Sequence, residues 1–216
     1  MSRRAILTLA SLATASALRN DGAIGHVIRT ALVAECLAEL VGMDAREQAT
    51  IRLVTPVHDI GKLAIADAVL LKPGRLDSHE RAAMERHSEI GADFLAGSAD
   101  GLLQFASQIA RSHHEHFDGT GYPLGLSGED LPLAVRVVAV ADTFDAMTED
   151  RCYHPGMADD SACEVLAAGR NTHFDPNVVS AFLAGFTKIR AARQKAAQLL
   201  ASGAEQDVVA AFYALR

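Results

Sequence analysis

Apolar residues recur at helical spacing along almost the whole chain, whereas the alternating pattern typical of strands is nearly absent. Val27, Ala31, Ala34 and Leu37, for example, mark one face of a helix that should end at Gly42. The sequence contains no internal repeat and no low-complexity linker. We therefore predict an all-α fold.

Capping and turn residues divide the chain into the expected helices. Asp44 suits the N-cap of a helix from Ala45 to about Asp59, in which Pro56 should introduce a kink. Asp77 or Ser78 suits the N-cap of a helix that runs through Leu95. Further helices are expected over residues 102–114, from 129–132 to about 147, from 175–176 onward, and over 188–216 with a break at 202–203.

The N-terminal residues 1–17 carry two arginines and then small apolar residues, which is the outline of a secretory signal. Ile6, Leu9 and Leu12 nevertheless recur near helical spacing, and threonine and serine interrupt the run, so we favour an amphipathic first helix. No other segment approaches the ~18 uninterrupted apolar residues that span a bilayer, because Arg136 divides the most apolar one.

The composition limits the kind of protein. A chain of 216 residues, 50% of them hydrophobic, can bury the core of one ordinary domain, with or without an appendage. The formal net charge of −7 argues against a nucleic-acid polymer as partner, although local cations could hold a small anionic ligand. Three cysteines without a C-x-x-C spacing argue against a disulfide framework and suit a reducing cytoplasm.

An adjacent His58 and Asp59 close an apolar run. On a helix the two side chains would project about 100° apart, so they could serve one divalent metal from two sides or bridge two metals. Such a pair alone is more often an ordinary hydrogen-bonded pair. Further candidate ligands shift the balance toward a metal centre, and they are His26, His87, His113, His114 and Asp142.

A long loop directly follows two of these candidates. Residues 115–128 contain four glycines and one proline and are not expected to form a helix. A loop of this length inside a compact domain is usually functional.

Six motifs follow one another along the chain: H-D-I-G-K at 58–62, L-L-K-P-G-R-L at 70–76, M-E-R-H-S-E-I-G at 84–91, H-H-E-H-F-D-G-T-G-Y-P at 113–123, R-V-V-A-V-A-D-T-F-D-A-M-T at 136–148 and H-F-D-P at 173–176. In order and spacing, this series resembles the HD-GYP subgroup of the HD-domain metal phosphohydrolases, from about Leu7 to about Phe186. The resemblance implies a helical HD bundle with a di-metal site in its core and a long G-Y-P loop.

The resemblance also implies a function and a division of the chain. Members of the family are cytoplasmic bacterial phosphodiesterases that open cyclic di-GMP to linear pGpG and often on to GMP, and some act on cyclic GMP-AMP. By this likeness, residues 1–186 form the catalytic domain. Residues 187–216 are then a C-terminal helical extension that packs on the domain or extends from it.

The family's metal ligands correspond to His26, His58, Asp59, His87, His113, His114 and Asp142. By the resemblance, Asp59 bridges two divalent ions, one held by His26, His58 and Asp142 and the other by the remaining three histidines. This mixture of nitrogen and oxygen donors suits Fe or Mn. Two such ions lower the pKa of a shared water and hold the resulting hydroxide in line with phosphorus.

The resemblance gives roles to three further residues, each of which could instead be structural. Lys62 and Arg151 could be ordinary exposed cations, but the corresponding residues of the family bind substrate phosphate. The resemblance also implies that Lys62, together with Asp59, is a catalytic residue. Tyr122 could simply shape a turn, but the family's G-Y-P loop borders the substrate cleft and contributes to partner contacts, among them diguanylate cyclases.

The chain departs from the family pattern in four places. Gly22 stands where many members have an acidic residue, which predicts two metals and not three. His154 replaces a basic residue, which predicts weaker or pH-dependent binding of phosphate. His116-Phe117 stands where the family commonly has Arg-Trp, and Ala66 replaces a usual proline, which bears on loop rigidity and not on chemistry.

Two other functions remain open at this point. The chain could be a catalytically weak binding module that engages cyclic dinucleotides or diguanylate cyclases, although the complete set of ligands argues against this. It could also be a di-iron HD oxidase, which Lys62 and the G-Y-P loop disfavour.

Overall fold

The computed structural model describes residues 1–17, 23–149 and 156–215, and within these ranges it contains helices and no strand. The α-helices are α1 (Arg3–Ala17), α2 (Ala23–Leu40), α3 (Ala45–Val54), α4 (Asp67–Leu70), α5 (Ser78–Glu85), α6 (His87–Ala96), α7 (Gly101–Ser112), α8 (Leu133–Thr148), α9 (Asp159–Ala168), α10 (Pro176–Ala184), α11 (Phe186–Leu200) and α12 (Glu205–Phe212). Three 3-10 helices are η1 (Thr55–Val57), η2 (Ile60–Ala64) and η3 (Gly128–Asp130). The all-α prediction is confirmed.

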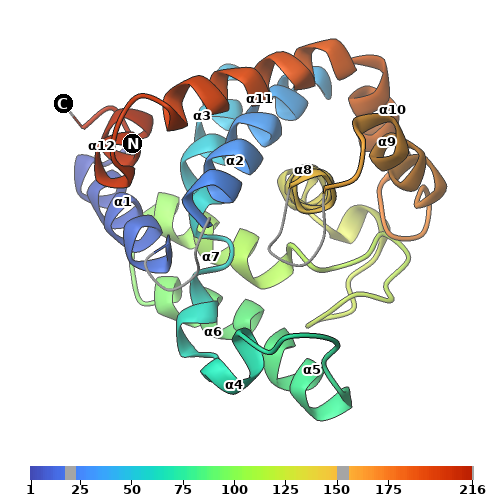
Figure 1. Ribbon diagram of the computed structural model, residues 1–216, viewed down its shortest axis with the longest axis horizontal. Coiled ribbons are helices and arrows are strands. Elements are labelled where there is room, and N and C mark those ends of the chain that lie inside the picture. Colours follow the sequence, from blue (N-terminus) through green and yellow to red (C-terminus); the bar gives the residue numbers. More distant parts are fainter. Residues whose placement is uncertain (18–22, 150–155, 216) are drawn as a thin grey trace.

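Helix α2 lies at the centre of the fold and packs against α3, α8 and α11 (Figure 1). Its apolar residues are buried on several faces, as Ile24, Ile28, Val33 and Leu37 show. A helix that is apolar almost all round has to be covered by neighbours on every side. This position brings His26, near the start of α2, into the interior of the protein.

The two ends of the described chain pack together. Helix α1 buries Ala5, Leu9 and Ala13 and contacts α12, as Figure 1 shows at its upper left. The hydroxyl of Tyr213 donates to the carbonyl oxygen of Leu53 at 3.1 Å. Residues after 186 thus pack on the same body, while the division at 186 stays a prediction. None of the described helices is long and apolar enough to cross a membrane.

Two helix predictions were wrong in ways that matter for the candidate ligands. The helix expected from Ala45 to about Asp59 ends at Val54 and gives way to η1, because Pro56 has no N–H to continue it. The helix expected through Leu95 is divided into α5 and α6 at Arg86. The short helix η1 that follows the first break ends directly before His58, and the second break falls directly before His87.

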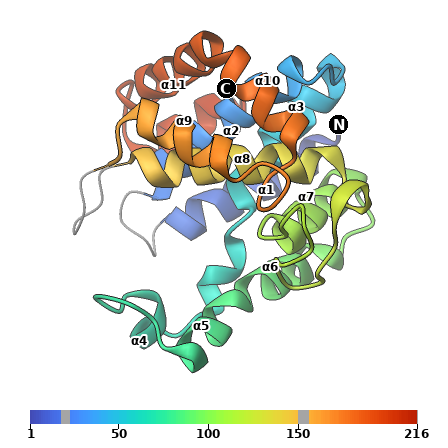
Figure 2. The same ribbon diagram turned by 90° about the vertical axis from the view of Figure 1, so that its right-hand side faces the viewer.

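Other local predictions are confirmed. Asp44 and Asp77 each accept hydrogen bonds in a capping box that begins the following helix. Gly42, at φ +86°, follows the end of α2. Helices α4 and α5 lie at one edge of the fold, where Figure 2 shows them at the lower left.

A close contact between two glycines joins η2 to α6. A Cβ atom added to Gly61 would lie 1.9 Å from the carbonyl oxygen of His87 and 2.5 Å from the amide nitrogen of Gly91. Only a residue without a side chain lets the two backbones approach this closely. The contact sets the His58-Asp59 pair beside the start of α6.

Candidate metal centre

The structure brings all seven candidate ligands together from five separate parts of the chain. His26 comes from α2, Asp142 from α8, His87 from the first residue of α6, His58 and Asp59 from the link between η1 and η2, and His113 and His114 from the residues after α7. Six of them form two groups, in each of which one ligand atom per residue lies within 4.8 Å of the others: Asp59, His87, His113 and His114, and His26, His58 and Asp59. Asp59 belongs to both.

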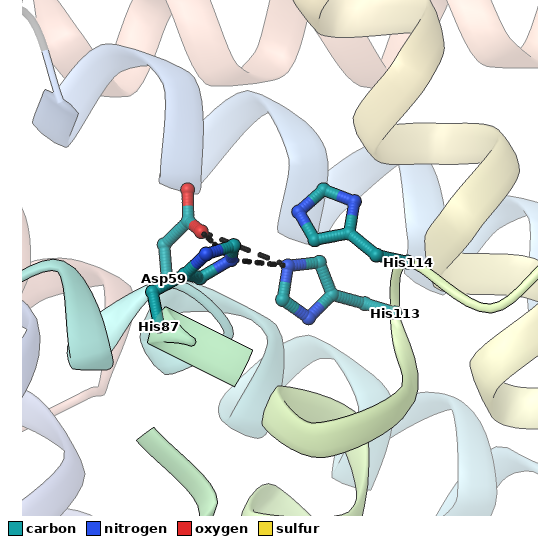
Figure 3. A group of neighbouring side chains, drawn as sticks. All are labelled: Asp59, His87, His113 and His114. Atoms are coloured by element: carbon teal, nitrogen blue, oxygen red, sulfur yellow. Dashed lines mark hydrogen bonds and ion pairs between the residues drawn. The ribbon is translucent and has the colours of Figure 1, made fainter. Parts of the chain in front are cut away.

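Two histidines of the first group, His87 and His113, approach the same oxygen of Asp59 (Figure 3). Oδ1 of Asp59 lies 3.2 Å from Nε2 of His87 and 3.6 Å from Nε2 of His113, and the two imidazole nitrogens are 3.5 Å apart. His114 lies next to His113, with ring centroids 4.0 Å apart. Two imidazoles thus approach a single carboxylate oxygen, and the third, that of His114, lies beside them.

The second group faces the other oxygen of Asp59 and also meets Asp142. Nε2 of His58 lies 3.5 Å from Oδ2 of Asp59 and 3.5 Å from Oδ1 of Asp142. Nε2 of His26 lies 3.1 Å from the same oxygen of Asp142. The two oxygens of Asp59 therefore point into two different clusters of nitrogen donors.

The residues present fit divalent metal ions. Nε2 of His58 and Oδ1 of Asp59 are buried and have no partner in hydrogen-bonding geometry. Buried polar atoms without a partner are costly, and cations in the two clusters, one beside Nε2 of His58 and one beside Oδ1 of Asp59, would satisfy them. Imidazole nitrogens with carboxylate oxygens are a donor set that first-row divalent ions accept.

Local turns orient three of the histidines. Nδ1 of His58 donates to the carbonyl oxygen of Thr55 at 2.8 Å, and Nδ1 of His87 donates to that of Met84 at 2.7 Å. Nδ1 of His113 lies 3.0 Å from the carbonyl oxygen of Ala110. In each case the carbonyl oxygen belongs to the residue three positions earlier in the chain. The local turn therefore holds the imidazole so that its Nε2 atom faces the cluster of candidate ligands.

The electrostatics of the site favour ionised carboxylates. Burial opposes ionisation of Asp59, but the neighbouring Lys62 and His58 outweigh it and lower its pKa well below the usual value. Burial and the neighbouring His113 lower the pKa of His114 to about 2, so its imidazole is neutral. Ionised carboxylates and neutral imidazoles are the forms that bind metals.

His26 differs from His114 in this respect. Burial acts against its protonation, but hydrogen bonds to Asp142 and Asp145 prevail and raise its pKa to about 10. A metal at this position would have to displace a proton from His26.

Two of the three predicted substrate residues lie beside the cluster. Nζ of Lys62 donates to Oδ2 of Asp59 at 2.5 Å. The ring of Tyr122 stacks on that of His114, with centroids 4.9 Å apart and an interplanar angle of 28°. Arg151 lies outside the described residues, as do Gly22 and His154, so the predictions for these three are not addressed by the structure.

The long loop after His114 is held by a buried carboxylate. Glu115 is only 2% exposed and accepts hydrogen bonds from the backbone N–H groups of Leu124 and Leu126. At Gly121 an added Cβ would lie 2.2 Å from the backbone nitrogen of His116, so the loop folds tightly back on its own start. The loop is therefore ordered, as expected, and it places Tyr122 against the histidines.

The sequence analysis missed four residues that support the centre. Asp145 and Arg29 stand behind His26, Glu149 pairs with Arg29, and Glu115 fixes the loop. A signal for the first two was present, because Asp145 follows Asp142 by three residues and Arg29 follows His26 by three, which places each pair on one helix face.

Comparison with protein families matches residues 11–178 to the HD domain. The chain is 44% identical over 178 residues to the cyclic di-GMP phosphodiesterase response regulator RpfG of Xanthomonas campestris, a match that covers 82% of this chain and 47% of the relative. It is 42% identical over 173 residues to the 3'3'-cGAMP-specific phosphodiesterase 2 of Vibrio cholerae, covering 80% of this chain and 33% of the relative. The chain spans less than half the length of these relatives.

Solved structures agree on the fold. Bd1817, an HDG"Y"P protein from Bdellovibrio bacteriovorus, aligns with a TM-score of 0.59 at 18% identity, over 75% of this chain and 51% of the other. A cyclic GMP-AMP specific phosphodiesterase of V. cholerae, V-cGAP3, aligns with a TM-score of 0.58 at 17% identity, over 88% and 52%. The chain therefore belongs to the HD domain family, and its motifs place it in the HD-GYP subgroup.

Proposed function

We propose that the protein is a metal-dependent phosphodiesterase that opens cyclic di-GMP to pGpG, with two divalent ions, Fe or Mn, as cofactors. One ion is held by His26, His58 and Asp142, the other by His87, His113 and His114, and Asp59 serves both. The observation that carries the proposal is the placement of Asp59, whose two oxygens face two separate clusters of imidazole nitrogens.

The relatives support the substrate class. Two of them are named as a cyclic di-GMP phosphodiesterase and a cGAMP-specific phosphodiesterase. The names agree on a cyclic dinucleotide and differ in its second base. We propose cyclic di-GMP as the substrate of this chain because the relative with the higher identity of the two carries that name.

The residues of the chain have separate tasks in this reaction. When bound, the metals supply Lewis acidity to the phosphodiester and lower the pKa of water. Lys62, at the edge of the cluster, exchanges its contact with Asp59 for a charge-assisted hydrogen bond to the scissile phosphate. Tyr122 borders the substrate and keeps His114 in place through its stacked ring. Arg151 meets substrate phosphate by resemblance to the family.

The G-Y-P loop is also proposed to contact partner proteins such as diguanylate cyclases. Leu124, which follows Tyr122-Pro123, is 53% exposed on this loop. An exposed leucine beside ordered backbone is the kind of side chain that a partner surface could cover.

Product analysis tests the function directly. The Mn²⁺-loaded protein is incubated with cyclic di-GMP and, separately, with 3'3'-cGAMP, and the products are separated by chromatography over time. We expect pGpG from cyclic di-GMP, and no product from Asp59→Asn under the same conditions. Tight binding of cyclic di-GMP without any hydrolysis would contradict the proposal and favour the binding module.

A further inference from the structure

His26 is oriented by a distant side chain, unlike the three histidines that local turns orient. Its Nδ1 atom lies 2.9 Å from Oδ2 of Asp145, which stands 119 residues later in the sequence. The contact joins α2 to α8, two helices that pack closely in the core. His26 is therefore the ligand whose orientation depends most on long-range packing.

Asp145 is itself held from its other side. Its carboxylate has no exposed surface, and it accepts Nε of Arg29 at 2.8 Å and Nη2 at 3.0 Å. The same guanidinium pairs with Glu149 at the end of α8. A buried carboxylate gripped at both oxygens by a guanidinium has little freedom to rotate, so Oδ2 is presented to His26 at a fixed position.

We propose that Asp145, fixed by Arg29, is a positioning residue that turns Nε2 of His26 toward the metal position shared with His58 and Asp142. This inference rests on the proposed di-metal function. An imidazole that donates Nδ1–H to a carboxylate keeps the Nε2 lone pair for a metal and is a more basic ligand than one that donates to a carbonyl. At one metal position a histidine is thus held by a carboxylate from another helix, whereas His87 and His113 at the other position are held by carbonyl oxygens of their own turns.

Arg29 has a second consequence for the number of ions. One ligand atom each from His26, Asp145 and Glu149 lies within 4.8 Å of the others, so these three could form a site of their own. The guanidinium of Arg29 contacts both carboxylates and already supplies the positive charge there. We therefore expect two ions per chain and none in this third group.

The substitution Asp145→Asn should disturb His26 whichever way the amide points. With its oxygen toward His26, the amide sets its NH₂ group against Nε–H of Arg29, so two donors face each other. With its NH₂ group toward His26, the amide donates to Nδ1, and the proton then sits on Nε2, where a metal should bind. Either arrangement weakens His26 as a ligand.

A Mn²⁺ titration tests the inference. Metal-free protein at one fixed pH is titrated with Mn²⁺, and the free ion is measured by electron paramagnetic resonance. We expect wild type to bind two ions. In Asp145→Asn we expect one ion to bind as before and the other about 10-fold to 100-fold more weakly, the usual effect of removing an outer partner of a ligand.

Asp175→Asn is the matched control. Asp175 is 2% exposed and pairs with Arg136, which is also on α8, so the same substitution breaks another buried carboxylate–guanidinium pair of the same helix. Asp175 contacts none of the candidate ligands among the interactions of the described residues. We expect this variant to lose stability but to bind two Mn²⁺ ions with wild-type affinity.

Arg29→Lys provides a second test that does not depend on the folding of Asp145→Asn. Lysine keeps the charge but loses the two-point grip on Asp145, so we expect a smaller weakening of the same single ion. Unchanged binding of both ions in folded Asp145→Asn or Arg29→Lys would overturn the inference. Equal weakening in Asp175→Asn would also overturn it, because the effect would then reflect general stability.

The titration also separates this inference from the function on which it rests. A wild-type protein that binds no Mn²⁺ would contradict the proposed di-metal function. Two ions in wild type with no selective loss in Asp145→Asn would contradict only the positioning role. A third ion in wild type would show that Arg29 does not take the place of a cation.

Discussion

The two halves of the proposed metal centre are built by different means. His87 and His113 are turned inward by carbonyl oxygens three residues earlier, and His114 is covered by the ring of Tyr122. His26 is turned inward by Asp145, which belongs to another helix and is held by Arg29. The first half is thus set by local turns and a loop, and the second by one local turn, at His58, together with packing between α2 and α8.

This difference has consequences for stability and for metal binding. A histidine oriented by its own turn keeps its direction as long as that turn is intact. A histidine oriented across two helices loses its direction when either helix shifts, so its metal position should be the more easily weakened. Asp59 connects the halves, and Gly61 sets the distance between them.

Asp59→Ala should have the largest effect on function, because it removes the ligand that both halves share. We expect both ions to bind poorly and turnover to fall by ~10³-fold or more, since metal catalysis supplies several kcal/mol of transition-state stabilisation. His58→Ala and His113→Ala should each abolish turnover but retain more metal than Asp59→Ala. Elemental analysis and product assays on the three variants measure this order, and wild-type rates in Asp59→Ala would contradict it.

Gly61→Ala should have the largest effect on the fold, because it forces the two halves apart. The new Cβ would meet the carbonyl oxygen of His87 at 1.9 Å, which we expect to destabilise the protein by about 3 kcal/mol or more. Gly97→Ala is the control, because its Cβ would meet nothing within 4 Å and its φ of −68° suits alanine. Urea unfolding of the metal-free proteins compares them, and equal midpoints would refute the contact.

Part of the candidate site and of the fold could be predicted from the sequence. The H-D, M-E-R-H and H-H motifs identified five of the seven candidate ligands, and the capping aspartates Asp44 and Asp77 located two helix starts. Each of these signals consists of residues that are close together in the chain, so it can be recognised from the sequence alone.

The remainder depends on the third dimension. The sequence analysis placed His58-Asp59 on an α-helix, whereas the pair lies between two 3-10 turns after Pro56. It also missed the contact of Asp145 with His26: the resemblance placed His26 and Asp142 on one ion, but no motif assigned a partner to the other nitrogen of His26. Contacts between charged residues that are far apart in the sequence can be identified only in the folded structure.

Lys62→Ala should separate substrate binding from metal binding. We expect kcat/KM to fall about 10-fold to 100-fold, the worth of one hydrogen bond between charged groups. The metal content should remain at two ions, because removal of the ammonium group frees Oδ2 of Asp59 and takes no ligand away. Lys188→Ala, which removes an exposed lysine paired with Glu39, is the control. Loss of bound metal in Lys62→Ala would show that the lysine is structural.

Mild acid should slightly lower the stability of the protein through His173, which lies against the long loop that supports His114. The loop is tied to residues 172–173, where the backbone N–H of Phe117 donates to the carbonyl oxygen of His173. Burial and the neighbouring His116 lower the pKa of His173 from 6.5 to about 4. The unfolded chain therefore binds more protons than the folded protein between these values, and stability falls as the pH falls through that window.

The expected loss through His173 is about 1 kcal/mol between pH 7 and pH 5, after allowance for its partial exposure to solvent. Urea unfolding of the metal-free protein at both pH values measures it. In His173→Gln this part of the pH dependence should disappear. The same pH dependence in wild type and His173→Gln would show that the imidazole does not carry the effect.

Anomalous diffraction from crystals of the Mn²⁺-loaded protein tests the two-part centre most directly. We predict two peaks per chain, one among His26, His58 and Asp142 and the other among His87, His113 and His114, with Asp59 in contact with both. A single peak would contradict the bridging role of Asp59. A third peak, whether among His26, Asp145 and Glu149 or elsewhere, would contradict a centre of two ions.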